Sequence, residues 1–132
     1  MGVDAHISGG FEMRDTVKAM KALSDETRLR ILNVLMEREC CVCEVMQALD
    51  ISETRASRNL GLLRDAGFLK LRKDGLWSLY SLDKEGMKGY SGELINSVRK
   101  ALKDSEVVAQ DRKRMENAER VGVSCVQRGG TR

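Results

Sequence analysis

The sequence predicts a mainly helical fold with one β-hairpin, the arrangement of a winged helix-turn-helix domain. Proline is absent from the 132 residues, and most apolar residues recur at the spacing of a helix face. Two short helical patterns follow each other with only a brief connection, as in a helix-turn-helix. An Asp-Gly dipeptide then separates two short runs rich in β-forming residues, a strong signal for a tight hairpin.

The chain has the length of one compact domain. Its 132 residues are 42% hydrophobic, which provides for one core and not comfortably for two. We expect a flexible arm over residues 1–10, the winged domain over residues 11–121 and a flexible tail over residues 122–132.

Two helices are expected before residue 40. Residues 11–22 have apolar side chains at i, i+4 and i+7, the spacing of one helix face. Ser24 is the N-cap candidate of the second helix, because two acids follow it in the first turn, where the helix dipole favours negative charge. A broad apolar face continues to a helix end near Arg38. The apolar positions of the first helix are Met13, Val17 and Met20.

The predicted helix-turn-helix and its wing follow. Residues 41–49 form the first short helix, and Ser52 caps the second, which is expected to end at Gly67. Residues 68–72 and 76–82 are expected to be the two strands of the hairpin. The chain order predicted up to this point is therefore four helices and two strands.

A long helical pattern covers residues 92–121. A single helix of about 30 residues would be about 45 Å long, more than so small a domain can cover alone. Its apolar stripe therefore suggests a subunit interface.

Positive charge is concentrated on the second helix of the helix-turn-helix and on the hairpin. Between residues 52 and 75 there are six basic residues and three acids, although the net charge of the whole chain is only +3. Such local charge attracts phosphates, and arginine reads guanine edges in the major groove. The helical spacing turns Arg55 and Arg58 outward, beside short hydrogen-bonding side chains that lie at Ser52, Thr54, Ser57 and Asn59.

Three cysteines, Cys40, Cys41 and Cys43, lie at the start of the first helix of the helix-turn-helix. Backbone N–H groups at a helix start, and nearby Arg38, are expected to lower the thiol pKa values. If the segment is fully helical, Cys40 and Cys43 can share an ion; if the helix begins later, Cys41 and Cys43 point the same way. Three thiolates suit trivalent arsenic or antimony, which are thiophilic.

These runs resemble the ArsR/SmtB family of metal-responsive repressors. The similarity covers residues 21–82 and is carried by KALSDETRLRILNVLM, CVCEVMQAL and ISETRASRNLGLLRDAGFLKLRKDGLWSLYSL. The resemblance implies a winged helix in the order α-α-α-α-β-β-α that forms a homodimer through its first and last helices. It also implies that this dimer binds double-stranded operator DNA and leaves it when an inducer binds. It also implies DNA contacts from one helix and from the wing. The residues at those positions are Ser52, Thr54, Arg55, Ser57, Arg58, Asn59, Arg72 and Lys73.

The segment CVCEVM is similar to the arsenic-responsive motif ELCVCDLC of that family. This similarity places Cys41 and Cys43 at two ligand positions, but Met46 stands at the third. The third sulfur must then come from Cys40, which proximity favours, or from Cys125 in the tail of either subunit. The implied inducer is As(III) or Sb(III), and no organic cofactor is implied.

Three other functions remain to be weighed against this one. Cys125 linked to Cys41 or Cys43 would make a redox or persulfide switch on the same fold, and a cadmium or lead sensor would look similar. An enzyme is not expected, because no histidine lies near the cysteines and no phosphate-binding loop is present. His6, the single histidine, is expected to be solvated. With neither a signal peptide nor an apolar membrane span, we expect a cytoplasmic protein without membrane partners.

Overall fold

The computed structural model describes residues 12–86 and 89–121 of the chain, and the expected arm and tail lie outside these residues. It confirms a mainly helical fold with a small antiparallel sheet. The elements in chain order are α2 (Met13–Leu23), α3 (Glu26–Leu35), β1 (Cys40–Cys41), α4 (Val42–Leu49), α5 (Glu53–Asp65), β2 (Leu69–Asp74), β3 (Trp77–Leu82), α6 (Tyr90–Ala101) and α7 (Glu106–Glu116).

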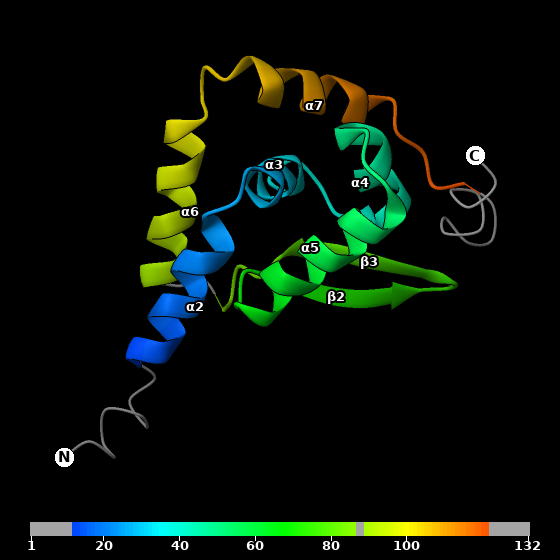
Figure 1. The fold of residues 1–132 in the computed structure, drawn as a ribbon. Helices are drawn as coiled ribbons and strands as arrows, with labels where there is room; N and C mark the ends of the chain where they lie inside the picture. Colours follow the sequence, from blue (N-terminus) through cyan, green and yellow to red (C-terminus); the bar gives the residue numbers. More distant parts are fainter. Residues whose placement is uncertain (1–11, 87–88, 122–132) are drawn as a thin grey trace.

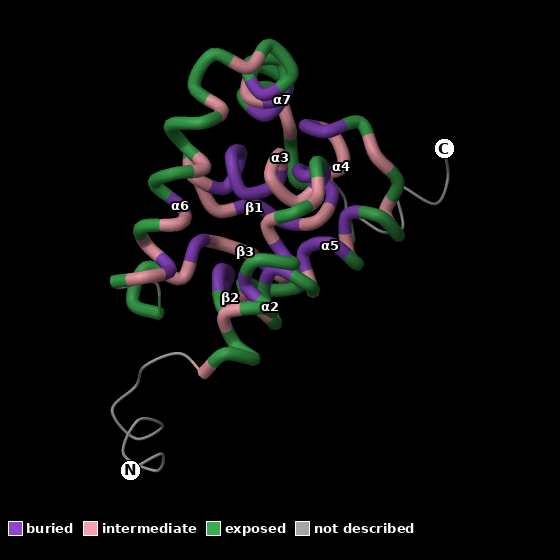
Figure 2. The backbone as a smooth tube through the Cα atoms, turned by 60° about the vertical axis from the view of Figure 1, so that its left-hand side comes forward, coloured by how far each residue is buried: buried purple, intermediate pink, exposed green. Residues whose placement is uncertain are grey.

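Helix α3 is the centre of the fold. Figure 1 shows α6 and α7 forming a corner around it, with α4 and α5 on its other side and the hairpin beyond α5. Its side chains Ile31, Leu32 and Val34 have no exposed surface. Figure 2 shows how burial differs between the helices: α3 and α4 have long buried stretches, whereas α2 and α6 are largely exposed or half-buried. Among the described helices, none is long and apolar enough to cross a membrane.

The junction of the first two helices differs from the prediction. Ser24 does not cap α3; it follows α2, and its hydroxyl donates to the Lys21 carbonyl at 2.9 Å. Asp25 is the cap of α3, and its carboxylate accepts the Arg28 N–H at 3.1 Å. Both residue types cap well, so the prediction chose the wrong one of two adjacent candidates. Helix α3 ends at Leu35, before Arg38.

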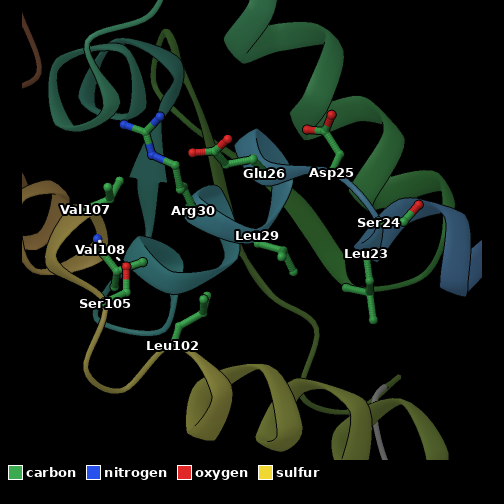
Figure 3. Close-up of a pocket in the computed structure, with 10 residues that line it drawn as sticks. All are labelled: Leu23, Ser24, Asp25, Glu26, Leu29, Arg30, Leu102, Ser105, Val107 and Val108. Carbon is green, nitrogen blue, oxygen red and sulfur yellow. Dashed lines mark hydrogen bonds between the residues drawn. The ribbon is translucent and has the colours of Figure 1, made fainter.

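The predicted single helix over residues 92–121 is wrong. The structure has two helices, α6 and α7, because the Ser105 hydroxyl accepts the Val108 N–H at 3.3 Å and starts a new helix (Figure 3). Val108 and Met115 are each 2% exposed. These two residues are therefore buried within their own chain, where α7 packs on α3 and α4.

A buried carboxylate fixes α7 in place. Asp111 has no exposed surface, and Arg30 of α3 donates to its two oxygens at 2.8 and 2.9 Å. Arg114 donates to one of these oxygens at 2.9 Å and to the Ala48 carbonyl at 2.8 Å. Arg30 also donates to the Leu49 carbonyl at 3.1 Å. The Asp111 carboxylate thus holds α7 to α3 directly through Arg30. The two arginines that it binds also attach α7 and α3 to the carboxyl end of α4.

The two-residue strand β1 was not predicted from the sequence. The sheet has the order β1-β3-β2, and Cys40 and Cys41 lie opposite Tyr80 and Leu79 of β3. Successive side chains of a strand point to opposite faces. Cys40 consequently belongs to the main core, whereas Cys41 joins a smaller cluster with Leu79.

The thiol of Cys40 is fully buried in the main core. It has no exposed surface, and its sulfur lies 3.7 Å from the Met115 sulfur. Burial, with a further contribution from the Glu44 carboxylate, raises the pKa of Cys40 to about 12. The expected lowering of this pKa is therefore wrong, because the loss of water outweighs the nearby Arg38.

Replacing Asp111 with asparagine should destabilise the fold by about 3–5 kcal/mol, because Arg30 and Arg114 would then face each other without a carboxylate. Urea unfolding measures this loss. Glu116→Gln on the exposed side of the same helix is the control, expected within about 0.5 kcal/mol of wild type. An Asp111→Asn protein that unfolds at the wild-type urea concentration contradicts the role given to this ion pair.

Cys40 makes a pH-dependent contribution to stability. Because its pKa in the folded chain is raised from its ordinary value near 9, its contribution is complete below about pH 9 and falls as the pH rises toward about 12. Cys40→Ala should be less stable than wild type at pH 7 by about 1 kcal/mol, and this difference should shrink above pH 9. Unfolding curves that stay equally far apart at all pH values would argue against this burial effect.

Candidate nucleic-acid interface and cysteine site

Helix α5 has a buried face and a polar exposed face. Its side chains Ala56, Leu60 and Leu63 have no exposed surface. Ser52 caps the helix by accepting the Arg55 N–H at 3.2 Å. The predicted contact residues on the exposed side of the helix are Ser52, Thr54, Arg55 and Arg58, with Ser57 half-buried.

Asn59 lies behind this exposed face. It is 5% exposed, and its carbonyl oxygen accepts from Arg28 at 2.9 Å while its amide donates to the Arg55 carbonyl at 2.9 Å. Arg28 also donates to the Ala22 carbonyl at the end of α2 at 2.7 Å. Asn59 thereby joins α5 to α3 and, through Arg28, to α2. The side chain of Arg55 reaches back to the Thr27 hydroxyl at 2.8 Å.

The wing presents two basic side chains, Arg72 and Lys73, and both are exposed. Arg72 donates to both carboxylate oxygens of Glu39 at 2.7 and 2.8 Å. This hydrogen-bonded pair lowers the pKa of Glu39. Beyond Gly75, which has a φ of 64°, the tip of the wing exposes Leu76, 73% of whose surface is accessible.

The three described cysteines lie in two different clusters: Cys40 is in the main core, and Cys41 and Cys43 are in the smaller cluster. Because α4 begins at Val42, Cys41 is its N-cap in extended backbone, and the Cys41 and Cys43 sulfurs lie 3.4 Å apart. Both residues are nearly buried, at 2% and 3% exposure, in a cluster with Leu79. Of the two pairings left open by the sequence, the structure brings together Cys41 and Cys43.

The other candidate ligands are placed differently. Cys40 faces the main core, and Cys125 lies outside the described residues. Met46, Trp77 and Val121 pack around the cluster of Cys41, Cys43 and Leu79. Within residues 12–86 and 89–121, no three ligand-type side chains converge on one point. The described chain therefore supplies a sulfur pair and no complete three-ligand site.

Glu44 was not predicted from the sequence as a site residue. Its buried carboxylate accepts the Cys41 N–H at 2.8 Å, Arg38 at 2.7 Å and Arg120 at 3.1 Å. Burial alone would raise the pKa of Glu44, but these three hydrogen bonds lower it below its ordinary value. A capping box combines an N-cap side chain with Glu three residues later, so the spacing of Cys41 and Glu44 was a usable signal. The contact with Arg120 had no such local signal.

The thiol pKa of Cys41 is raised rather than lowered as expected. Burial is the largest cause and outweighs the Glu44 backbone N–H, which acts in the opposite direction. Arg38, which was expected to help, is engaged with the Glu44 carboxylate instead. Cys41 therefore keeps its proton at neutral pH.

An apolar pocket of about 380 Å³ lies between the start of α3 and the α6–α7 corner. Figure 3 shows the residues that line it. Leu29, Leu102 and Val108 line it, together with Arg30, whose guanidinium is engaged with Asp111. None of the residues predicted to bind DNA or metal lies there.

Comparison with known proteins identifies relatives of this chain. The model of the family described as "Bacterial regulatory protein, arsR family" matches residues 25–75. The cadmium resistance regulatory protein CadC homolog of Staphylococcus aureus is 47% identical over 75 residues, covering 56% of this chain and 62% of that protein. The arsenical resistance operon repressor of Bacillus subtilis is 32% identical over 82 residues, covering 61% of this chain and 78% of the repressor.

The first four curated relatives are matched over only 52–63% of their own length. Among solved structures, the homodimeric winged helix-turn-helix domain of Mb0332 from Mycobacterium bovis has a TM-score of 0.60 and 26% identity. It covers 70% of this chain, which covers 82% of that domain. The sequence matches and the winged fold agree, and the chain belongs to the arsR family of bacterial regulatory proteins.

Proposed function

We propose that this chain is a transcriptional repressor that binds operator DNA as a dimer and is released when As(III) or Sb(III) binds its cysteines. The observation that carries this proposal is the 3.4 Å separation of the Cys41 and Cys43 sulfurs. The pair lies at the first turn of α4, the helix that precedes α5. A repressor of this kind works where the chromosome is, in the cytoplasm.

The spacing of the two sulfurs suits a single trivalent ion. With metal–sulfur bonds of about 2.3 Å, a separation of 3.4 Å gives an angle of about 95° at the ion. That angle is narrower than the tetrahedral angle of about 109° that structural zinc prefers. It fits the pyramidal bonding of As(III) or Sb(III), whose lone pair occupies the fourth direction.

The burial of the Cys41 thiol also favours a metalloid over a divalent cation. Arsenite is the neutral trihydroxide at pH 7, and each thiol that binds it transfers its proton to a leaving hydroxyl, which departs as water. A divalent cation must instead expel the protons into solution, which costs more when the thiol pKa is raised. The raised pKa of Cys41 therefore supports arsenite or antimonite rather than cadmium or lead.

For the third sulfur we propose Cys125. Proximity in the sequence favoured Cys40 instead. Cys40 faces the opposite side of β1, in the main core. Val121 contacts the cluster that contains the sulfur pair. The four residues from there to Cys125 span at most about 14 Å, which is long enough to return to the pair.

The DNA surface in this proposal is the exposed face of α5 together with the wing. Arg55 and Arg58 would read base edges, and Lys73 and Arg72 would contact phosphates. Arg72 would exchange its partner Glu39 for a phosphate. We propose Asn59 as a support of this surface, because its side chain is buried against Arg28.

The sulfur pair is connected to the proposed DNA surface through two helices that are in contact, α4 and α5. Cys41 is the N-cap of α4, and α4 packs directly on α5. A shift of the first turn of α4 would therefore change the position of α5. Allosteric coupling of this kind is typically worth about 1–3 kcal/mol, or roughly 5- to 150-fold in affinity.

Cysteine substitutions test the sensing function. In gel shifts with operator DNA, arsenite should release the reduced wild-type protein, whereas Cys41→Ser, Cys43→Ser and Cys125→Ser should stay bound because the three-sulfur site is broken. Cys40→Ser is the matched control and should still respond. Wild-type protein that stays bound at saturating arsenite would refute the sensing claim.

The same series separates the alternatives. If oxidant or sulfide releases the DNA and arsenite does not, and mass spectrometry finds a link from Cys125 to Cys41 or Cys43, the protein is a redox or persulfide sensor. If cadmium or lead acts at lower concentration than arsenite, the preference for a metalloid is wrong.

Arg58→Ala tests the DNA surface. It should weaken operator binding by about 1–3 kcal/mol and relax the preference for one base, as expected for an arginine that reads guanine. Lys113→Ala on the exposed side of α7 removes the same charge away from this surface and should leave binding unchanged. Fluorescence anisotropy with matched and mismatched duplexes provides the measurement. Equal loss in the two variants would mean that only general charge matters.

A further inference from the structure

A polar pocket of about 260 Å³ lies between the end of α3 and the α6–α7 corner. Figure 1 shows α6 and α7 turning around α3 at this corner. None of the residues predicted to bind DNA or metal lines the pocket. Its volume is below the roughly 300–1,000 Å³ of pockets that hold drug-sized molecules, which favours a small ligand.

Three positive side chains and one carboxylate line this pocket. Arg99 comes from the end of α6, Lys103 from the corner and Arg112 from α7. Among the described residues, none of the three has an ion-pair partner, and neither has Glu37, the acid of the pocket. The Arg99 guanidinium donates to the neutral Asn96 side chain at 3.1 Å. The pocket therefore has two positive charges in excess, which a dianion would neutralise.

Asn33 supplies an uncharged polar group to the same pocket. It lies on α3 between Leu32 and Val34, which have no exposed surface, and is itself 4% exposed. Its side-chain oxygen is buried and has no hydrogen-bond partner in the part of the chain that the structure describes. A buried acceptor without a hydrogen bond costs free energy that a leucine at the same position would not. The group that this position lacks is a hydrogen-bond donor.

We propose that this pocket binds a small phosphate monoester of a polyol. The phosphate oxygens accept from Arg99, Lys103 and Arg112, since charged donors form the strongest hydrogen bonds with phosphate. A hydroxyl of the alcohol part donates to the Asn33 oxygen, and Leu102 provides an apolar wall for its carbon atoms. The site is separate from the sulfur pair, and the inference does not depend on the proposed metalloid sensing.

Calorimetry of the full chain tests the site at about pH 8, where a phosphate monoester is a dianion because its second pKa is about 6. Glycerol 3-phosphate should bind saturably at constant ionic strength, with one molecule in each chain. Glycerol, which lacks the phosphate, should not bind. Glycerol 3-phosphate that gives no saturable binding at millimolar concentration would overturn the proposal.

Arg112→Gln tests the cationic part of the pocket. The affinity for glycerol 3-phosphate should fall about tenfold, the effect of losing one charged hydrogen bond. Lys113→Gln removes the same charge from the next residue, which is exposed and does not line the pocket, and should bind as wild type does. Equal losses in the two variants would show general attraction of anions and refute the site. A loss in Arg58→Ala instead would place the ligand on the proposed DNA surface.

Asn33→Leu tests the hydroxyl contact. Methyl phosphate carries the same dianionic group without a hydroxyl, so wild type should prefer glycerol 3-phosphate by about threefold to tenfold. Asn33→Leu should bind methyl phosphate as wild type does and lose this preference. Circular dichroism checks that the variant is folded, and the wild-type preference and Arg112→Gln decide the matter if it is not. A preference that is absent from wild type, or that survives in folded Asn33→Leu, would contradict the role given to Asn33.

Discussion

The buried carboxylate of Glu44 is the interaction on which the cysteine site depends. It accepts the Cys41 N–H and so fixes the first turn of α4. It also binds Arg38 and Arg120, which hold the segment after α7 against the same turn. The sulfur pair, the start of α4 and the segment after α7 are thereby joined at one charge that is nearly inaccessible to water. Any ligand that moves one of these parts must disturb the others, and α5 packs against the helix that they share.

Most of the fold was accessible from local patterns, because helix faces, caps and an Asp-Gly turn are encoded within a few residues. The failures had the same local origin. Ser24 and Asp25 are both good caps, and only the structure shows that Asp25 performs this role in α3. Ser105 interrupts an otherwise continuous apolar stripe, and sequence periodicity did not show that its hydroxyl starts α7.

The site was harder to predict than the fold because its geometry depends on tertiary contacts. A strand of two residues decides that Cys41 and Cys43 share one side while Cys40 faces the other. Such a strand is too short to leave a periodic signal. Burial reversed the expected thiol pKa shift, and it also placed Asn59 against Arg28 rather than on the exposed face of α5. Arg120 owes its role to a residue more than seventy positions away.

The central claim is that a trivalent metalloid takes three sulfurs from Cys41, Cys43 and Cys125. X-ray absorption at the arsenic edge of the arsenite-loaded, reduced protein counts these neighbours directly. Our account predicts three sulfur neighbours and no oxygen in the wild type, with one sulfur replaced by oxygen in Cys125→Ser. Arsenic that keeps three sulfur neighbours without Cys125, or that retains oxygen in the wild type, would contradict it.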